Sequence, residues 1–502
     1  MINVFNLRGN QRTSGELSRR EGGKVFGSGS RTPIAITLLV RNPAAKGKAQ
    51  IHYHDIGDYL SREEKLERIK KFTSVLSPEM KLSSITPNEE NDWLNQRDGL
   101  FDTFIPIVAE KKYDCSAMSF FILNTRGLET SRDSIVYSSS QEGLSRNVHN
   151  MIAEYNAQRI DFQEIRRTKE IKVEDFVKDE TKEIIWTRGT RNDLDRNIAY
   201  SYDEKSCRIA MYRPFFKQFA YFSSQCNEYV NQWPKIFPTP QTKNLVICVS
   251  GLGGSKEHSV FISNRIIDLN CLDSGTQCFP MFYFEKVKQD QPGLFDFEKS
   301  DYSRRDGISD FILERARALN PKITKENIFY YVYGILHNPD YIKRFSADLK
   351  KTLPRIPLPE EYWIFKAYCK AGEELAKLHL NYEDGELCRD VIVSGCEYGD
   401  FRVKKMRFIS KDDKRTILLN ERIKIENIPL SAYDYIINGK SAIEWVMEKY
   451  AITINAESGI LNDPNKWSEN PRYILDLLLR VIQMSTETRK IIAKLPKLYF
   501  PG

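Results

Sequence analysis

Residues 6–40 of the chain, NLRGNQRTSGELSRREGGKVFGSGSRTPIAITLLV, decide how its N-terminal part folds. Up to residue 31 the segment alternates glycine, arginine and asparagine with few hydrophobic residues. Because glycines weaken regular structure and backbone polar groups need partners, we expect a surface loop here and no helix. The apolar residues 34–40 predict a buried strand after this loop. Arginines in the loop could bind phosphates, or the loop could be a flexible basic arm with no specific ligand.

The composition predicts a globular protein of several domains. The chain has 502 residues, the length of about two to four domains of roughly 100–200 residues each. Hydrophobic residues make up 41% of the chain and aromatic residues 12%, which is enough to build packed cores. The net charge of +7 is modest, but the only acidic residues among residues 1–50 are Glu16 and Glu21. The positive charge is therefore concentrated at one end of the chain.

Cysteine and histidine patterns predict neither disulfides nor a metal site. The nine cysteines form no CxxC pair and no secretory signal is present, so we expect reduced thiols in a cytoplasmic protein. His52 and His54 would share one face of a strand, but no Cys pair or HExxH motif accompanies them, and zinc is not expected. No apolar run approaches the ~20 residues of a membrane helix, so no membrane partner is expected.

The first half of the chain has several recognisable boundaries. Residues 1–5 have the pattern of a strand already in progress, which suggests a truncated reading frame or a piece of a longer polypeptide. Residues 50–54 are expected to pair with the strand at 34–40 as a hairpin. The sequence SREE at 61–64 is a capping box that opens a helix. A charged stretch at 165–182 marks the first domain boundary.

Strands and helices are expected in separate runs beyond that boundary. Short strands rich in aromatic residues are predicted at residues 184–186, 209–212, 219–222, 245–249, 260–262 and 279–284. Amphipathic helices are predicted at residues 308–319, 326–337, 340–352, 360–378, 441–449 and 471–484. Gly, Asn and Ser clusters separate the strands, which favours a twisted sheet or partial barrel over alternating strand–helix units.

The glycine cluster GLGGSK at residues 251–256 does not match a phosphate-binding loop. Ser255 separates Gly254 from Lys256, whereas that loop needs glycine and lysine side by side. A hairpin turn after the strand at 245–249 is the better interpretation. The chain has no GxSxG or kinase signature, so no segment taken alone resembles an active site.

Basic residues mixed with aromatic and amide residues recur in three segments: WTRGTRN at 186–192, YRPFFKQ at 212–218 and RVKKMR at 402–407. Arginines and amides on turns between strands suit phosphate binding and base reading in the major groove. In the alternative interpretation the aromatic residues are core and the basic residues are its solvated rim. The three segments together favour a nucleic-acid partner.

Six long segments carry a family resemblance. They are NLRGNQRTSGELSRREGGKVFGSGSRTPIAITLLVRNP at 6–43, IHYHDIGDYLSREEKL at 51–66, RIAMYRPF at 208–215, FYYVYGILHNPDYIKRFSADLKKTLPRIPL at 329–358, SAIEWVMEKY at 441–450 and SGILNDPNKWSENPRYILDLLLRVI at 458–482. Through them the chain resembles the C-terminal portion of the Type ISP restriction–modification enzymes. Those enzymes are single polypeptides that resemble a nuclease, a helicase-like translocase, a coupler, a methyltransferase and a specificity domain in series.

The resemblance implies an α/β fold, in which an incomplete methyltransferase-type sheet is followed by an α+β target-recognition domain with strand-rich and helical subdomains. Residues 1–165 would be the C-terminal part of the adenine methyltransferase module. Residues 166–306 would form the strand-rich subdomain, residues 307–385 the helical subdomain, and residues 386–502 the C-terminal α+β part of the specificity domain.

The resemblance also limits what this chain can do alone. Amino-methyltransferases of this kind hold S-adenosylmethionine in a glycine-rich loop and grip the flipped adenine with an Asn/Asp-Pro-Pro-aromatic motif. Neither pattern occurs in this sequence, so we expect no cofactor, no catalytic residue and no activity for the chain alone. S-adenosylmethionine, ATP and magnesium belong to the full-length family. The implied partners are double-stranded DNA and, as an alternative, a separate chain that carries the missing methyltransferase and translocase parts.

Basic and amide side chains are the candidate DNA contacts. Phosphate contacts from the N-terminal loop would set the position of the duplex, and the turns at 186–192, 213–218 and 251–256 would read bases. The candidate set is Arg8, Asn10, Arg12, Lys24, Arg31, Arg188, Arg191, Arg213, Lys217, Lys256, Lys404 and Arg407.

Three hypotheses follow from these patterns. In the first, the chain is the DNA-binding specificity portion of a restriction–modification enzyme and is inactive without its missing parts. In the second, it belongs to an active methyltransferase whose catalytic half comes from a separate chain. In the third, it is a non-catalytic interaction module that caps a truncated sheet.

Overall fold

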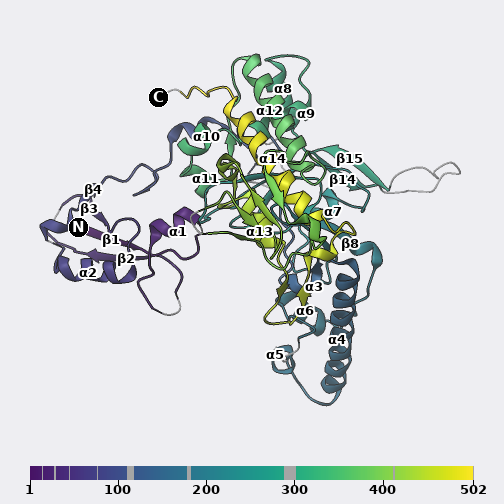
Figure 1. Cartoon of the computed structure of the whole chain (residues 1–502). Helices are drawn as coiled ribbons and strands as arrows, with labels where there is room; N and C mark the ends of the chain where they lie inside the picture. Colours follow the sequence, from purple (N-terminus) through teal and green to yellow (C-terminus); the bar gives the residue numbers. More distant parts are fainter. Residues whose placement is uncertain are drawn as a thin grey trace.

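The computed structural model describes residues 1–13, 15–27, 30–44, 46–75, 77–109, 118–177, 182–287, 301–410 and 413–500. Helices and short strands surround three hydrophobic cores, which confirms the mixed α/β fold class. The N-terminal sheet stands to the left of the body, and a long helix projects from the lower end of the body (Figure 1).

The N-terminal sheet has the strand order β2-β1-β3-β4. Its strands are β1 (Ile2–Arg8), β2 (Ile34–Leu39), β3 (Ile51–Asp55) and β4 (Ser83–Ile85). β1 pairs antiparallel with β2 and parallel with β3, so the predicted hairpin between 34–40 and 50–54 is wrong. β1 takes the central place because every second residue of it is buried, and Phe5 and Leu7 must face the small core beneath helix α2 (Arg62–Phe72). The predicted capping box opens α2.

Two further expectations for residues 6–40 are wrong. Gly15–Glu21 form helix α1 where no helix was expected, because the glycine-free stretch inside it is long enough for one turn. The turn closes when the Gly22 amide donates to the carbonyls of Ser18 and Arg19. β2 is not buried either, since it is the edge strand of the sheet and Leu39 is 74% exposed.

Two four-stranded sheets form the centre of the body. One has the order β11-β10-β13-β6 and the other the order β12-β8-β9-β7. Their strands are β6 (Thr125–Arg126), β7 (Tyr137–Ser138), β8 (Cys207–Arg213), β9 (Phe216–Tyr221), β10 (Val246–Val249), β11 (Val260–Ser263), β12 (Ile266–Ile267) and β13 (Gln277–Pro280). β14 (Phe282–Lys286) and β15 (Tyr302–Asp306) form a separate hairpin. The predicted strands at 209–212, 219–222, 245–249 and 260–262 are confirmed.

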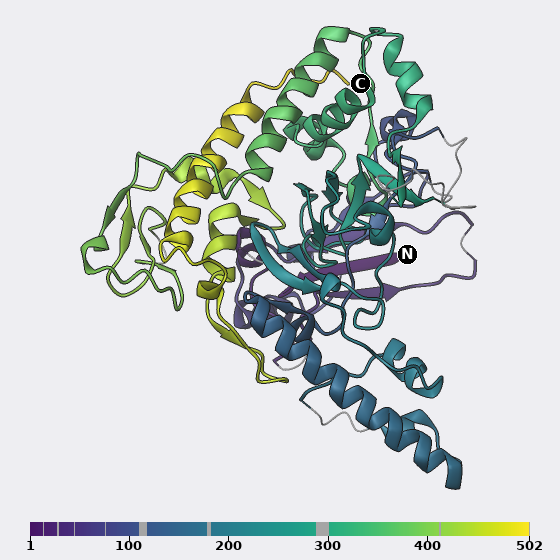
Figure 2. The ribbon, with the colours of Figure 1, turned by 90° about the vertical axis from the view of Figure 1, so that its right-hand side faces the viewer.

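The predicted strand at 184–186 is wrong. Ile184 is buried without pairing, and Thr187 then caps helix α6 (Arg188–Asp195). Helix α3 (Asp133–Val136) leads into α4 (Gln141–Thr168), and α5 (Val173–Phe176) packs against α6 near the far end of α4. Figure 2 shows these elements as an arm that leaves the body. α4 runs through residue 165, and the predicted domain boundaries stay predictions.

A layer of helices covers the other side of the central sheets. It contains α8 (Asp310–Arg317), α9 (Lys325–Ile335), α10 (Pro339–Arg344), α11 (Asp348–Lys351) and α12 (Tyr362–Leu380), whereas α7 (Trp233–Ile236) packs against β14. The single helix predicted at 340–352 is therefore two short helices. α9 and α12 cross closely, because Gly334 and Gly372 leave no side chain between them. β5 (Ile105–Pro106) pairs with β16 (Arg355–Ile356) below this layer.

The C-terminal part combines small sheets with two helices. Its strands are β17 (Ile392–Ser394), β18 (Arg407–Phe408), β19 (Ile417–Leu418), β20 (Lys424–Glu426), β21 (Ile436–Ile437), β22 (Lys440–Ser441), β23 (Thr453–Ile454) and β24 (Leu461–Asn462). α13 (Ala442–Lys449) and α14 (Tyr473–Ala493) pack on each other, and α14 also packs on α12. The apolar stripe of the helix predicted at 471–484, formed by Ile474, Leu477, Leu478 and Val481, is buried.

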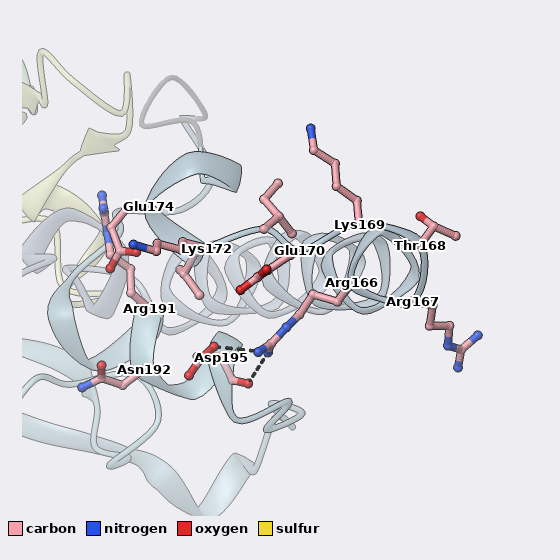
Figure 3. Close-up of a pocket in the computed structure, with 12 residues that line it drawn as sticks. Arg166, Arg167, Thr168, Lys169, Glu170, Lys172, Glu174, Arg191, Asn192 and Asp195 are labelled. Carbon is pink, nitrogen blue, oxygen red and sulfur yellow. Dashed lines mark hydrogen bonds and ion pairs between the residues drawn. The ribbon is translucent and has the colours of Figure 1, made fainter.

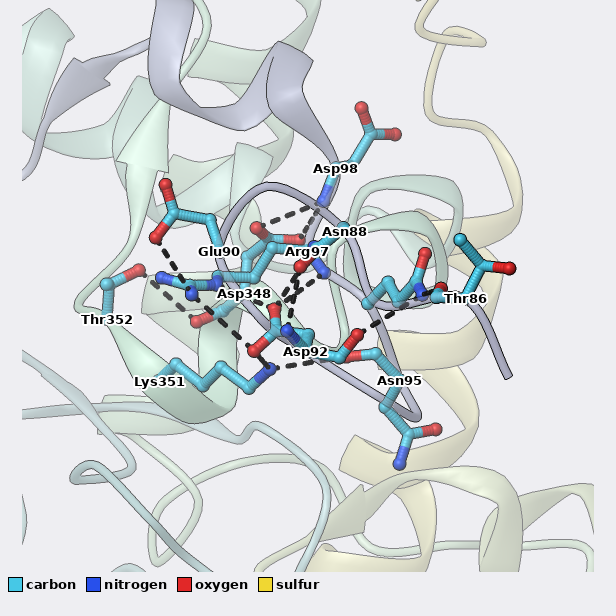
Figure 4. Close-up of polar contacts among 11 residues, drawn as sticks. Thr86, Asn88, Glu90, Asp92, Asn95, Arg97, Asp98, Asp348, Lys351 and Thr352 are labelled. Atoms are coloured by element: carbon cyan, nitrogen blue, oxygen red, sulfur yellow. Dashed lines mark hydrogen bonds and ion pairs between the residues drawn. The ribbon is translucent and has the colours of Figure 1, made fainter. Parts of the chain in front are cut away.

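A polar linker joins the N-terminal sheet to the helical layer (Figure 4). Asp92 accepts a hydrogen bond from Arg97 Nε at 2.9 Å and forms an ion pair with Lys351 Nζ at 2.6 Å. Asp98 pairs with Arg344 at 2.7 Å. The Arg97 hydrogen bond, with that of Lys351, holds the pKa of the Asp92 carboxyl well below its usual range. These contacts fix the linker to α10 and α11.

Candidate nucleic-acid interface

A buried lysine fixes residues 21–23 of the N-terminal loop, the segment between β1 and β2. Lys65, on α2, is fully buried and its Nζ donates to the carbonyl oxygens of Glu21 at 2.6 Å and Gly23 at 2.7 Å. Burial lowers the pKa of this ammonium group. Gly22 and Gly23 allow this segment to approach the backbone before α2 closely, because a Cβ at Gly22 would lie 2.1 Å from the Leu60 carbonyl oxygen. Residues 21–23 are therefore fixed against α2.

Two of the predicted N-terminal contacts, Arg8 and Asn10, are bound to other residues of the protein. Arg8 ends β1 and is engaged internally, since its Nε donates to Asp55 at 2.6 Å and its Nη1 pairs with Asp58. Burial alone would lower the pKa of Arg8, but Asp55 and Asp58 raise it. Asn10 is part of the loop frame, because its amide donates to Glu21 Oε2 at 2.9 Å and its side chain accepts from the Arg12 amide at 3.0 Å.

Arg12 and Arg31 lie close together on the outer side of the same loop. The Gln11 amide donates to the Arg31 carbonyl at 2.9 Å, and Arg31 Nη2 donates to the Gln11 carbonyl at 3.3 Å. Arg12 and Arg31 are exposed, and Lys24 is half-buried. The loop therefore presents cations on a backbone that is already ordered, which lowers the entropic cost of binding a polyanion.

Arg188 and Arg191 lie on helix α6 and not on a turn between strands. Thr187 caps this helix, and its hydroxyl accepts from Nη2 of the buried Arg132 at 2.7 Å. Arg191 lines an open hollow of about 700 Å³ between α6 and the far end of α4 (Figure 3). Arg166 crosses this hollow to Asp195 at 3.2 Å.

Other basic side chains surround the same hollow. Arg167, Lys169 and Lys172 also line it, and the ends of the Arg167 and Lys169 side chains extend outward (Figure 3). All three are exposed. Because the acidic residues Glu170 and Glu174 lie among them, this end of the arm carries mixed charge with a small basic excess.

Arg213 and Lys217 are engaged inside the body at the β8–β9 turn. Arg213 Nη1 donates to the buried Asp268 at 2.6 Å, and its guanidinium lies over the Tyr212 ring at 3.9 Å. Lys217 pairs with Glu383 at 2.5 Å. Both cations therefore have a structural contact that competes with any phosphate.

Lys256 lies in the loop between β10 and β11, where the predicted hairpin turn is confirmed. Its amide donates to Asp273 Oδ2 at 2.9 Å. The glycine cluster in this loop does not fit S-adenosylmethionine, because a Cβ at Gly251 would lie 2.0 Å from the Ser274 carbonyl and the Gly253 amide donates to Lys350. Gly251 and Gly254 of this loop therefore pack against residues 273–275.

Lys404 and Arg407 are exposed and lie on a segment beside the hairpin of β23 and β24. The Ile452 amide donates to the Lys404 carbonyl at 3.0 Å, which connects the basic segment 402–407 to the hairpin of β23 and β24. Sequence reasoning missed this hairpin as a candidate contact. The signal was present in Asn455 and Gly459, two turn residues between short apolar runs.

The candidate residues thus fall into separate places and do not form one cluster. Arg12, Lys24 and Arg31 share the N-terminal loop, Arg188 and Arg191 share α6, and Lys404 and Arg407 share one segment. Lys65, which orders the N-terminal loop, was also missed, because a single lysine on an amphipathic helix carries no sequence signal of burial.

Three further properties concern the described residues only. No group of three or more His, Cys, Asp or Glu side chains among them could hold a metal ion. The cysteines among them are free thiols. No described helix is both long and apolar enough to cross a membrane.

Comparison with known proteins identifies the family. Residues 119–477 match the family described as Type ISP C-terminal specificity domain. The chain belongs to this family. No curated protein matches it significantly.

Solved structures extend the similarity to the whole chain. A nuclease-deletion mutant of the Type ISP restriction–modification enzyme LlaGI, in complex with a DNA substrate mimic, is 36% identical with a TM-score of 0.87. The ATP-dependent Type ISP enzyme LlaBIII bound to DNA is 33% identical, also with a TM-score of 0.87. Both comparisons cover 100% of this chain. The DrdV–DNA complex is 27% identical over 99% of this chain, with a TM-score of 0.82.

The similar structures are longer than this chain. It spans 44% of the LlaGI chain, 31% of the LlaBIII chain and 48% of the DrdV chain. The sequence therefore corresponds to less than half of each.

Proposed function

We propose that the chain recognises a specific sequence in double-stranded DNA as the specificity portion of a Type ISP restriction–modification enzyme. The observation that carries this proposal is the similarity of the whole chain to two Type ISP enzymes solved with DNA or a DNA mimic. Recognition needs phosphate contacts that set the register and base contacts that select the sequence. The exposed Arg12 and Arg31, held on the ordered N-terminal loop, supply groups of the first kind.

The chain's own residues would act by holding the duplex. A methyltransferase that modifies a base inside a duplex must extrude it, at a cost of a few kcal/mol. Contacts made by the recognition portion offset that cost. S-adenosylmethionine would be held elsewhere, since Gly251 and Gly254 of the glycine cluster pack against residues 273–275.

Binding to duplex DNA as a function of salt tests the proposal. The affinity should fall steeply between about 50 and 200 mM salt, because each neutralised phosphate contributes about 0.9 to the slope of log K against log salt. The double variant Arg12→Ala, Arg31→Ala should bind more weakly with a smaller slope. Lys322→Ala is the control, since this exposed lysine lies in the helical layer away from the loop. Absent binding, or binding independent of salt, contradicts the proposal.

One observation favours a second candidate, in which a further chain completes an active methyltransferase. β2 is an edge strand of apolar residues, yet all of it after Ile34 is exposed. Unpaired apolar edge strands are aggregation-prone and are normally covered. A separate chain with the missing glycine loop and Asn-Pro-Pro motif could add strands there.

Mixing the two chains with labelled S-adenosylmethionine and duplex DNA tests the second candidate. Methyl transfer by the mixture, and by neither chain alone, is the expected result. Transfer by this chain unaided contradicts it. Leu38→Lys in β2 should reduce the activity of the mixture without changing DNA binding by this chain.

A further inference from the structure

The hairpin of β23 and β24 stands on a rigid stem. The Ser139 amide donates to Asn462 Oδ1 at 2.9 Å, and the Ile452 amide donates to the Lys404 carbonyl at 3.0 Å. Asp463, just beyond the hairpin, pairs with Arg402 at 2.7 Å. Figure 2 shows the hairpin as a narrow yellow-green ribbon that leaves the body beside the body end of α4. The stem is therefore tied to the body on both sides.

The hairpin keeps an apolar pair exposed, although Ile460 packs on the core of the body and the hairpin lines a hollow together with Tyr137 and Tyr212. β23 and β24 form a two-stranded sheet. Ile454 is 69% exposed and Leu461, which lies opposite it, is 53% exposed. An exposed apolar pair on a projecting hairpin indicates a contact surface, because it gains nothing from water.

The tip of the hairpin is ordered by its own hydrogen bonds. Asn455 Oδ1 accepts from the amides of Glu457 at 3.1 Å and Ser458 at 2.8 Å. Gly459 takes the positive φ of +69° that the turn needs. The Glu457 carboxylate is exposed at this tip.

Positive charge flanks the base of the hairpin. Lys404 and Lys405 are exposed on the segment hydrogen-bonded to the hairpin, and Lys466 is exposed just after it. Glu457 is the one charged residue of the hairpin, and lysines lie on both sides of its base. This charge distribution matches a DNA groove, where bases lie between two rows of phosphates.

We propose that the β23–β24 hairpin enters the major groove of the target duplex and determines part of its sequence specificity. The inference rests on the proposed DNA recognition and names the element that would contact the bases. A two-stranded ribbon fits the major groove. Glu457 would accept from the amino group of cytosine, the apolar pair Ile454 and Leu461 would contact a thymine methyl group, and Lys404 and Lys405 would bind the flanking phosphates.

Selection of binding sites from a random duplex library tests this role with the full chain. Wild-type protein should enrich one consensus. Glu457→Ala should lose the preference for cytosine at one position, with a loss of discrimination there of about 10- to 100-fold. The double variant Ile454→Ala, Leu461→Ala should relax a neighbouring position. Glu421→Ala is the matched control, because Glu421 is an exposed acid between the paired strands β19 and β20.

The flanking lysines should behave differently from the tip. Lys404→Ala with Lys405→Ala should leave the consensus unchanged and reduce the salt slope by about 0.9 for each lost phosphate contact. Thermal melting of each variant establishes that it is folded.

The outcomes separate the two proposals. If the wild-type chain selects a consensus and the tip variants select the same one with the same affinity, the hairpin inference is overturned while DNA recognition stands. That result would instead assign the apolar pair to a protein contact. If the wild-type chain enriches no sequence at all, the proposed function itself fails.

Discussion

Arg213 lies where β8 turns into β9, and its guanidinium enters the core. It is 14% exposed, and Asp268 is 1% exposed. Burial alone would lower the pKa of Arg213, but Asp268, Tyr212 and Asp133 raise it above its ordinary value. Asp133 also accepts from the Tyr212 hydroxyl at 2.9 Å. The pair therefore belongs to a buried polar network that depends on every member.

Removal of the arginine should destabilise the protein strongly. Arg213→Ala leaves the Asp268 carboxylate buried with no counter-charge, and breaking a buried pair from one side costs about 3–5 kcal/mol. Urea unfolding should show this loss. Arg12→Ala, at an exposed site, should change the free energy of unfolding by less than about 0.5 kcal/mol. Equal stabilities of the two variants would contradict the internal role of Arg213.

At the scale of elements, the sequence predicts some features well and others poorly. The helices at 360–378 and 471–484 form because their apolar stripes specify which face is buried, and the capping box at 61–64 is a purely local signal. The partner of β2 could not be predicted, since strand pairing depends on residues far apart in the sequence. The apolar segment at 184–186 contributes Ile184 to the core but does not pair as a strand.

For the candidate DNA contacts, the sequence predicts the exposure of some side chains and not of others. Arg12 and Arg31 are exposed as a phosphate contact requires, because a polar glycine-rich loop has to lie at the surface. Arg213 has the same local pattern of basic and aromatic neighbours, yet it is buried. Composition around a residue cannot tell whether an acidic partner such as Asp268 is brought to it by a distant strand.

The crossing of α9 and α12 offers a test at this scale. A Cβ at Gly372 would lie 1.9 Å from the Tyr330 carbonyl oxygen, which is backbone and cannot move away alone. Gly372→Ala should therefore push the helices apart and destabilise the protein by about 1–3 kcal/mol. Gly99→Ala is the control, because nothing lies within 4 Å of the added atom. Calorimetry that shows equal melting temperatures for both variants would contradict the close crossing.

At the scale of the molecule, the N-terminal sheet has its own small core and reaches the body through the linker at 86–98. The linker carries Asp92, which joins Arg97 to Lys351 of α11. Since the N-terminal loop and the β23–β24 hairpin lie on different parts of the chain, one duplex can engage both only if this linker keeps its place.

Loosening the linker should therefore be visible by limited proteolysis. Asp92→Asn removes the charge that holds Lys351, so cleavage within residues 86–98 should become faster while the body stays resistant. Asp102→Asn is the matched control, because Asp102 is 72% exposed and lies 3.7 Å from Arg355. Unchanged cleavage in the Asp92 variant would show that other contacts fix the linker.

The central claim is that this chain distinguishes one duplex sequence from others. The most direct test is competition at one fixed salt concentration between the consensus duplex selected by the wild-type chain and bulk genomic DNA. Specific recognition predicts that the consensus competes at least about 10³-fold better per site than bulk DNA. Equal competition by the two DNAs would contradict the account.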